Sequence, residues 1–222
     1  MKQSIFEIKT NRKIAKNTFE MVLAGDTTAI TAPGQFVNIK LKGFFLRRPI
    51  SVCNWNDESL DILTGLGNGF ECDPAISGKR PVLIGGGAGV PPLYGLAKAL
   101  IARGIRPQVI LGFNTAEEVF YRDEFEKLGA DLHITTADGS IGTKGFVTDV
   151  MKELDYTYFY TCGPEPMLKA IERIAVTSGQ YSFEERMGCG FGACMGCSCK
   201  TKYGNKRICK EGPVLEREEI IW

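Results

Sequence analysis

The segment Pro81–Leu93 reads PVLIGGGAGVPPL and predicts a strand, a glycine turn and the start of a helix. Its first four residues form a short apolar run typical of a buried strand, and Pro91 and Pro92 fit the first helical turn, where a missing N–H costs nothing. Amides in such a turn and the helix N-terminus both face a bound anion. A plain structural turn is the alternative, because a glycine string alone is a weak motif. The candidate pyrophosphate-binding residues are Gly85, Gly86, Gly87 and Gly89.

Strands and helices alternate on the carboxyl side of this segment. The helix that it opens has one apolar face, formed by Leu93, Leu96, Ala97, Leu100 and Ile101. Further strands are predicted at Gln108–Phe113, Leu132–Thr136 and Tyr156–Thr161, and further helices at Arg122–Leu128, Phe146–Leu154 and Met167–Val176. Repeated strand–helix units indicate a doubly wound parallel sheet over residues 79–180.

A second turn, TCGPEPM at Thr161–Met167, follows the last predicted strand of this sheet. Ligands of doubly wound sheets bind outside the carboxyl ends of the strands, although a simple strand-to-helix turn would read the same way. The candidate nicotinamide-binding residues here are Cys162, Gly163, Pro164 and Met167. Residues 114–117, NTAE, offer an acid and no arginine cluster after the second strand, which favours NAD over NADP.

Residues 1–78 read as β-structure. Val37, Ile39 and Leu41 alternate with polar residues, as in a half-buried strand. Other predicted strands are Ile5–Ile8, Thr18–Leu23, Pro49–Asn54 and Leu60–Leu63, and turn residues separate them. Short strands at this spacing suggest a small antiparallel barrel. Arg47 and Arg48 precede one of these strands and could contact a phosphate, but a surface charge pair is the more ordinary reading.

Residues 181–222 form a cysteine-bearing tail. Four cysteines have the spacing C-x4-C-x2-C-x11-C, and C-x4-C-x2-C with a distant fourth cysteine is the plant-type pattern for a [2Fe–2S] cluster. The candidate ligands are Cys189, Cys194, Cys197 and Cys209. Interleaved glycines allow a loop to wrap the cluster and bring amides near its sulfides.

Zinc and disulfides are the alternatives for these cysteines. Zinc sites usually show two C-x2-C arms, whereas only Cys194 and Cys197 make such a pair. A disulfide framework does not suit a chain that otherwise reads as a reduced cytosolic enzyme. Cys199 is interpreted as a bystander thiol and His133, the only histidine, as a structural residue.

Composition excludes several classes of protein. A chain of 222 residues with 44% hydrophobic and 24% charged residues can form two compact domains and an appendage. A net charge of +1 gives no footprint for nucleic acid or an anionic membrane. Residues 1–7, MKQSIFE, lack the apolar core of a signal peptide, and no apolar run reaches the length of a membrane span. We therefore expect a cytoplasmic protein with reduced thiols.

Together these motifs resemble the ferredoxin-reductase superfamily, in which a flavin-binding barrel precedes a nicotinamide-nucleotide domain. The cysteine-rich tail is similar to that of the electron-transfer subunits of type B dihydroorotate dehydrogenases. The matching segments are residues 85–93, 162–167, 184–190, 207–209 and 211–214.

The resemblance implies an electron relay between NAD, FAD and the [2Fe–2S] cluster. It places FAD at Arg48, Pro49, Ile50 and Ser51, with Arg48 on the phosphate and Ser51 at the flavin ring edge. It also implies an FMN-containing catalytic subunit, in a heterotetramer of two plus two, that oxidises dihydroorotate to orotate in pyrimidine (UMP) biosynthesis. This chain shows no candidate dihydroorotate site, so the pathway reaction requires that partner.

The chain departs from the family in its first domain. Family members carry further strands and a V-G-x-G-T-type loop that also holds FAD, whereas here Asp57–Leu60 runs directly into Asp61–Phe70. The predicted barrel is therefore shortened. Three alternatives to the relay stay open: a stand-alone NAD(P)H-dependent flavin and iron–sulfur reductase, a flavin-less regulatory or scaffold subunit, and a zinc-stabilised nucleotide-binding module.

Overall fold

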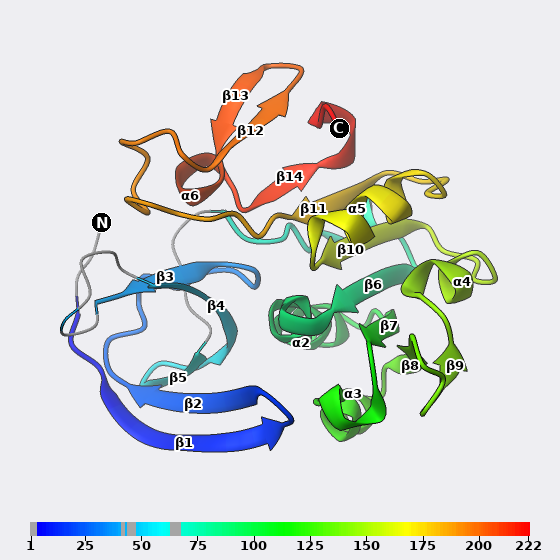
Figure 1. Ribbon diagram of the computed structural model, residues 1–222, viewed down its shortest axis with the longest axis horizontal. Helices are drawn as coiled ribbons and strands as arrows, with labels where there is room; N and C mark the ends of the chain where they lie inside the picture. The colour runs from blue at the N-terminus through cyan, green and yellow to red at the C-terminus, as the bar shows by residue number, and fades with distance from the viewer. Residues whose placement is uncertain (1–3, 41–42, 44–47, 63–67) are drawn as a thin grey trace.

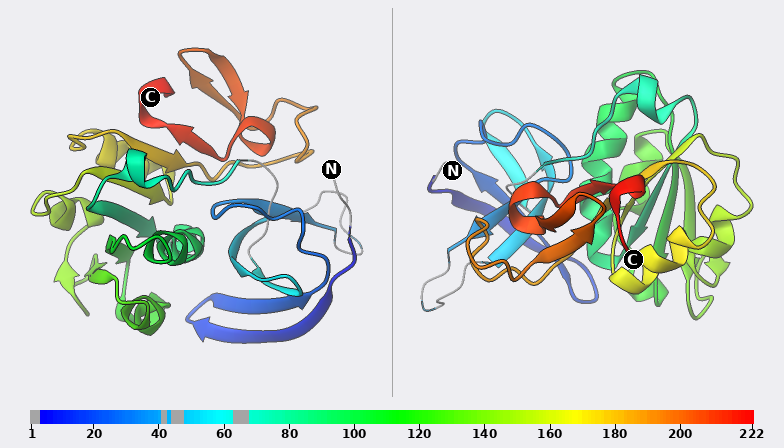
Figure 2. Two further views of the ribbon diagram at one scale, coloured as in Figure 1. Left: turned by 180° about the vertical axis from the view of Figure 1, so that it is seen from behind. Right: turned by 90° about the horizontal axis from the view of Figure 1, so that it is seen from above.

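The computed structural model describes residues 4–40, 43, 48–62 and 68–222, with no side-chain description for 59–62. A curved antiparallel sheet lies beside a larger sheet flanked by helices, and the C-terminal segment lies over both (Figures 1 and 2). No helix within the described ranges is long and apolar enough to cross a membrane.

The N-terminal sheet contains five strands in the order β1-β2-β5-β4-β3. Their bounds are Glu7–Ala15 (β1), Thr18–Ala24 (β2), Phe36–Ile39 (β3), Arg48–Trp55 (β4) and Ser59–Ile62 (β5). Leu23, Ile30 and Val52 form its small core. Because β1 and β3 end the strand order, no strand pairing closes the barrel within the described residues. This open sheet agrees with the shortened barrel that the sequence predicts.

The larger sheet contains seven strands in the order β14-β11-β10-β6-β7-β8-β9, parallel except for β14. Their bounds are Pro81–Gly86 (β6), Gln108–Phe113 (β7), Asp131–Thr136 (β8), Thr143–Lys144 (β9), Tyr158–Cys162 (β10), Gly179–Ser182 (β11) and Val214–Glu216 (β14). The chain moves from β6 outward to β9 and then crosses to the other side of β6. The predicted doubly wound sheet is confirmed.

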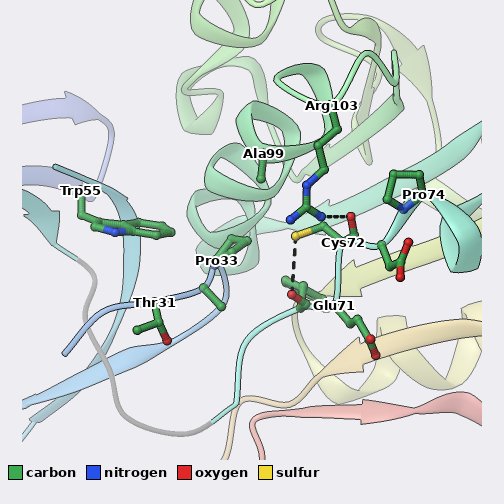
Figure 3. Close-up of a pocket in the computed structure, with 11 residues that line it drawn as sticks. Thr31, Pro33, Trp55, Glu71, Cys72, Pro74, Ala99 and Arg103 are labelled. Atoms are coloured by element: carbon green, nitrogen blue, oxygen red, sulfur yellow. Dashed lines mark hydrogen bonds between the residues drawn. The ribbon is translucent and has the colours of Figure 1, made fainter. Parts of the chain in front are cut away.

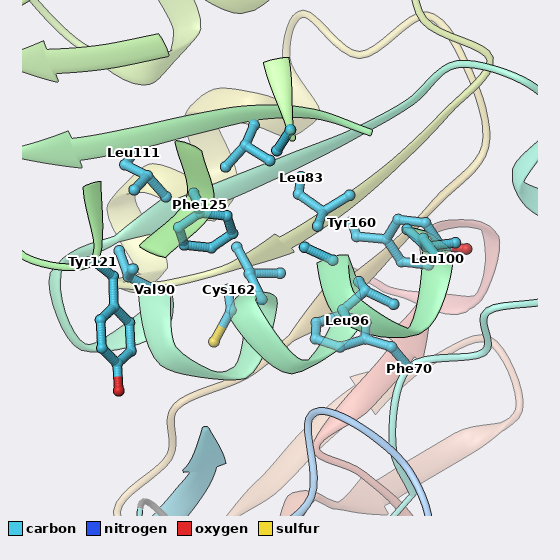
Figure 4. Close-up of a cluster of buried hydrophobic side chains, with 14 of the residues drawn as sticks. Phe70, Leu83, Val90, Leu96, Leu100, Leu111, Tyr121, Phe125, Tyr160 and Cys162 are labelled. Atoms are coloured by element: carbon cyan, nitrogen blue, oxygen red, sulfur yellow. The ribbon is translucent and has the colours of Figure 1, made fainter. Parts of the chain in front are cut away.

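Helices cover both faces of this sheet. The principal helices are α2 (Val90–Ile101), α3 (Arg122–Lys127), α4 (Val147–Met151) and α5 (Glu165–Glu172). Alternate residues of β6 point to opposite faces, so Leu83 joins a core with α2 and α3, while Val82 and Ile84 join a second core with α4 and α5. Figure 4 shows Leu96 and Leu100 of α2 against Leu83 and Tyr160 in the first of these cores.

The remaining elements are short. They are α1 (Pro74–Ser77), α6 (Ile208–Glu211), β12 (Ser198–Thr201), β13 (Gly204–Arg207) and the 3-10 turns η1 (Gly87–Gly89), η2 (Ala116–Glu118) and η3 (Arg217–Glu219). β12 and β13 form a hairpin of their own. β11 and β14 pair with each other, and the N–H of Phe183 donates to the carbonyl of Pro213 at 3.0 Å. The cysteine-bearing segment therefore leaves the large sheet and returns to it at neighbouring strands.

Candidate functional site: a nucleotide crevice, a flavin element and four cysteines

The two predicted nucleotide turns meet at the carboxyl ends of neighbouring parallel strands. Gly85 of β6 pairs with Cys162 of β10, and the strand order changes direction between these two strands. A Cβ built on Gly89 would lie 2.0 Å from the Cys162 carbonyl oxygen, so only glycine permits this approach. The turns thus form one crevice at the topological switch point, where open α/β sheets bind their ligands.

Each turn leads into a helix whose N-terminus borders the crevice. Gly89 precedes α2, and Pro164 precedes α5. A Cβ on Gly86 would lie 2.6 Å from the Sδ atom of Met167, so Met167 covers the strand end from the α5 side. The two helix N-termini and the intervening amides suit a pyrophosphate. Cys162 is buried, and burial raises the pKa of its thiol, which keeps it a neutral packing residue.

The acidic segment that favours NAD lies after β7, at η2. The side chain of Glu117 pairs with Lys16 of the N-terminal sheet at 2.9 Å, and Glu118 accepts a hydrogen bond from Asn114. Because Lys16 offsets the charge of Glu117, Glu118 is the acid that contributes negative charge at this strand end, where a 2′-phosphate would need an arginine. His133 pairs with Ile110 in the sheet ladder, and its Nε2 lies 3.9 Å from Asp131, away from the crevice.

The predicted flavin element lies on β4, at the border of the two sheets. Arg48 to Ser51 pair with β3 from Ile39 back to Phe36. Two residues further along β4, the Cys53 carbonyl oxygen approaches helix α2 so closely that a Cβ on Gly95 would lie 2.8 Å from it. β4 is thus held against the helix that carries the pyrophosphate turn.

A hollow of about 590 Å³ opens at the far end of β4, between Trp55, Pro33 and helix α2 (Figure 3). Arg103 of the helix end reaches across it and donates to the Cys72 carbonyl. None of the residues that line it is a predicted site residue. Because β4 spans eight residues, the hollow lies roughly 25 Å from Arg48 along the strand.

The four candidate cluster ligands gather as two pairs. The Cys189 sulfur accepts from the amides of Ala193 and Cys194, at 3.3 and 3.5 Å, and the Cys209 amide donates to the Cys197 sulfur at 3.4 Å. Among the residues that the structure describes, no group of three or more His, Cys, Asp or Glu side chains converges on one point. Two pairs suit a binuclear cluster, in which each iron takes two protein ligands.

Glycines line the cysteine loop. Cβ atoms built on Gly188 and Gly196 would lie 3.4 and 3.5 Å from the Cys194 sulfur, so both glycines border this thiol. Cys197 and Cys209 are buried, while Cys194 is exposed. The residues therefore fit a cluster with one sheltered and one accessible side. Cys199 belongs to neither pair and lies on β12 opposite Lys206.

The two pairs differ in acidity. Hydrogen bonds from the backbone of Cys194 and Phe191 lower the pKa of Cys189 to about 6. Burial, with the adjacent Cys197, raises the pKa of Cys209 to about 12. Since the thiolate is the form that binds metal, Cys189 is ready to bind at neutral pH, whereas Cys209 loses its proton only as metal arrives.

We expect this difference to control alkylation of the metal-free protein. Iodoacetamide labelling of Cys189 should increase as the pH rises through about 6, because the thiolate forms above its pKa, while Cys209 should stay largely unlabelled at pH 8. Peptide mass spectrometry over a pH series measures both rates. Burial also raises the pKa of Cys199, which serves as an internal reference. Half-maximal labelling of Cys189 near pH 9 would contradict the expectation.

The cysteine loop contacts the strand beside the flavin element. The side-chain amide of Asn38 on β3 donates to the Gly190 carbonyl at 3.0 Å, and Asn38 pairs with Pro49 in the sheet ladder. Phe36 of the same strand packs in one core with Cys197 and Cys209. Strand β3 therefore separates the predicted flavin and cluster sites by one strand.

Two contacts of the site were not predicted from the sequence. In the sequence, Asn38 is only a polar position of an alternating strand, although its amide holds the cluster loop. Arg207 and Glu211 lie in two of the matching segments, and their side chains form an ion pair around the Cys209 turn. Periodicity and motif spacing carry no signal for such contacts. Asn38 and Gly190 are distant in the sequence, and the ion pair of Arg207 and Glu211 forms only when the turn around Cys209 has folded.

Comparisons with known proteins agree with this arrangement. Residues 184–221 match the iron–sulfur cluster binding domain of dihydroorotate dehydrogenase B, and residues 83–173 match the oxidoreductase NAD-binding domain. A solved structure of an NADH-dependent reduced ferredoxin-NADP oxidoreductase is 27% identical, with a TM-score of 0.84 over 98% of this chain and 90% of that chain. Phthalate dioxygenase reductase, 17% identical with a TM-score of 0.63 over 90% of this chain and 86% of its own, shares the fold.

Curated relatives cover the whole chain. The electron transfer subunit of dihydroorotate dehydrogenase B (NAD(+)) from Geobacillus sp. (strain WCH70) is 41% identical over all of this chain and 99% of its own, and that of Bacillus mycoides (strain KBAB4) is 41% identical over 96% of each. The first alignment has 256 positions for 222 residues, so 34 of its positions have no counterpart here. The chain belongs to the family of electron transfer subunits of dihydroorotate dehydrogenase B.

Proposed function

We propose that this chain passes electrons between NAD(H), an FAD at β4, its own [2Fe–2S] cluster and an FMN-containing catalytic subunit. With that subunit, in an assembly of two copies of each, it would convert dihydroorotate to orotate in pyrimidine biosynthesis, in a cytoplasm that keeps its thiols reduced. Residues 1–78 would bind FAD, residues 79–180 would bind NAD and residues 181–222 would bind the cluster.

The single observation that carries the proposal is the position of β4 between the other two sites. On one side its Cys53 carbonyl packs against α2, below the pyrophosphate turn. On the other side its neighbour β3 holds the cysteine loop through Asn38 and Gly190. A bound flavin exchanges a hydride with nicotinamide and single electrons with an iron–sulfur centre, so a flavin on β4 would stand where both exchanges are needed.

The residues of this chain would bind and orient the carriers. The turns at Gly85–Gly89 and Cys162–Pro164 would hold the pyrophosphate and present the nicotinamide ring toward β4. Arg48 would anchor the FAD phosphate, and Ser51 would meet the flavin ring edge. The sheltered pair Cys197 and Cys209 faces the core that includes Phe36 of β3, while the exposed Cys194 faces outward.

The outward side of the cysteine loop suits a protein partner. Phe191 and Met195 flank Cys194 and are 54% and 49% exposed, an apolar rim beside the accessible ligand. Exposed apolar residues beside a functional group mark an interaction site. We propose that the FMN subunit docks on Phe191 and Met195, which would bring its flavin close to the cluster.

Phe191→Asp is expected to weaken this docking by at least about tenfold in Kd, which corresponds to about 1.4 kcal/mol. Co-purification and stopped-flow reduction of the cluster by the FMN subunit measure the loss, while NADH oxidation with a small-molecule acceptor should stay unchanged. Val176→Asp, at an 82% exposed residue beyond α5, is the control. Equal effects of the two substitutions would contradict this docking site.

The open barrel favours one competing function, a flavin-less regulatory or scaffold subunit. β1 and β3 end the strand order, and the relative's alignment contains 34 positions that this chain lacks. The visible spectrum of anaerobically purified protein, with iron, sulfide and FAD assays, separates the two functions. Flavin and cluster bands together support the relay, and Arg48→Ala should then lower FAD occupancy. A cluster without flavin supports the scaffold, and a colourless zinc-loaded protein contradicts both.

A further inference from the structure

Arg207 and Glu211 enclose the turn that presents Cys209. Arg207 is the residue before helix α6, and its Nε atom lies 2.9 and 3.1 Å from the two carboxylate oxygens of Glu211. The same carboxylate accepts the backbone N–H of Arg207 at 2.6 Å. Cys209 lies between the two residues in the sequence, so this ring of hydrogen bonds fixes the turn on which the fourth ligand sits.

The second arm of Arg207 reaches the other ligand pair. Its Nη1 atom donates to the Gly192 carbonyl at 2.7 Å, and Gly192 lies between Cys189 and Cys194. Gly192 has a φ of +90°, and a Cβ there would lie 2.8 Å from the Lys210 side chain, so the loop accepts only glycine at this contact. One guanidinium therefore joins the Cys189–Cys194 loop to the Cys209 turn.

A binuclear cluster needs its two ligand pairs at one fixed separation. Groups that contact the ligands from behind and hold them in place affect both the metal affinity and the reduction potential of a site. The same loop carries the Ala193 and Cys194 amides that donate to the Cys189 sulfur, and N–H groups near the sulfurs favour the more negative, reduced cluster. Loss of the contact between Arg207 and the Gly192 carbonyl would therefore change both the stability and the reduction potential of the cluster.

We propose that Arg207 is a positioning residue that tethers the two ligand pairs and thereby sets the stability and the potential of the cluster. The proposal rests on the proposed cluster but concerns a residue that is not a ligand. Its planar fork contacts the Glu211 carboxylate and the Gly192 carbonyl at once, and its backbone N–H donates to the same carboxylate. Lysine carries the same charge but cannot form the bidentate contact.

The chain contains a matched arginine away from the cysteines. Arg217 places its Nε atom 3.1 and 3.3 Å from the carboxylate oxygens of Glu172, and its Nη1 atom donates to the Thr177 carbonyl at 2.6 Å. Both arginines are partly buried. Arg217→Lys therefore reproduces the chemical change of Arg207→Lys without touching the cysteine loop.

The test compares Arg207→Lys with Arg217→Lys in the full chain, alone and with its partner subunit. We expect Arg207→Lys to make reduction of the cluster about tenfold less favourable, a shift of about 59 mV downward for a one-electron couple. Its EPR line shape should change, and release of iron to a chelator should be at least about tenfold faster. Arg217→Lys should match wild type in all three measurements. An unchanged or raised potential with wild-type iron release in Arg207→Lys would overturn the proposal.

Glu211→Gln distinguishes positioning from simple charge. It keeps the arginine charge but loosens its anchor, so positioning predicts a smaller downward shift, whereas a pure charge effect predicts an upward shift and none for Arg207→Lys. If Arg207→Lys does not assemble a cluster while Arg217→Lys does, the tether is supported. The reduction potential is then measured on Glu211→Gln instead. If wild type binds zinc instead, the proposed relay fails, but faster zinc release from Arg207→Lys would still support the tether.

Discussion

Cys209→Ser is expected to abolish the visible absorption and the EPR signal of the cluster and to leave the protein with little iron. The Cys209 side chain is buried and its amide donates to the Cys197 sulfur, so no other thiol can take its place without moving α6. Serine supplies a hard oxygen in place of the soft thiolate that iron–sulfur clusters require. Anaerobic reconstitution with iron and sulfide, followed by metal analysis, measures the loss.

Cys199→Ser is the matched control for this substitution. Cys199 is half-buried in the same tail, but it pairs with Lys206 on the β12–β13 hairpin and lies outside both ligand pairs. It should keep the full cluster signal. If Cys199→Ser lost the cluster while Cys209→Ser kept it, Cys199 and not Cys209 would be the fourth ligand.

Gly89→Ala is expected to lower the free energy of unfolding by about 3 kcal/mol, at the upper end of what overpacking usually costs. Its Cβ would lie 2.0 Å from the carbonyl oxygen and 2.3 Å from the carbonyl carbon of Cys162. Both atoms belong to the backbone of β10, so the two nucleotide turns must separate. Urea unfolding measures the loss of stability, and titration with NADH should show no saturable binding.

Gly87→Ala separates the packing effect from the binding effect. Gly87 has a φ of +51°, and a Cβ there would meet no atom within 4 Å, so its cost is about 1 kcal/mol of backbone strain. The added methyl group points into the open side of the turn, where we propose that the pyrophosphate binds. This variant should therefore fold almost normally and still bind NADH more weakly. Equal losses of stability in the two variants would contradict the assigned contact.

The sequence was informative where local pattern and topology coincide. Strand β7 matches its predicted bounds at Gln108–Phe113, and helices α2 and α3 begin where the prolines and the apolar spacing indicated. The prediction that the turns at Gly85–Gly89 and Cys162–Pro164 serve one ligand also follows from topology, because neighbouring parallel strands end at the same edge. The structure places these turns in contact.

Contacts between distant segments could not be predicted in this way. β11 and β14 are short, and each gains its hydrogen bonds only from a neighbour that the pattern does not specify. Helices α4 and α5 end several residues before the predicted Leu154 and Val176, since apolar spacing continues beyond the last helical turn. The predicted strand end at Leu63 lies outside the described residues.

Neighbouring strands β11 and β14 have a consequence for how the metal centre is made. The hydrogen bond between Phe183 and Pro213 holds the two ends of the intervening segment at the spacing of adjacent strands, about 4.8 Å. Closing a loop of about thirty residues costs roughly 3 kcal/mol of chain entropy. The pairing of β11 with β14 offsets this cost before any iron binds. We therefore expect the metal-free segment to remain attached to the folded nucleotide domain through these two strands.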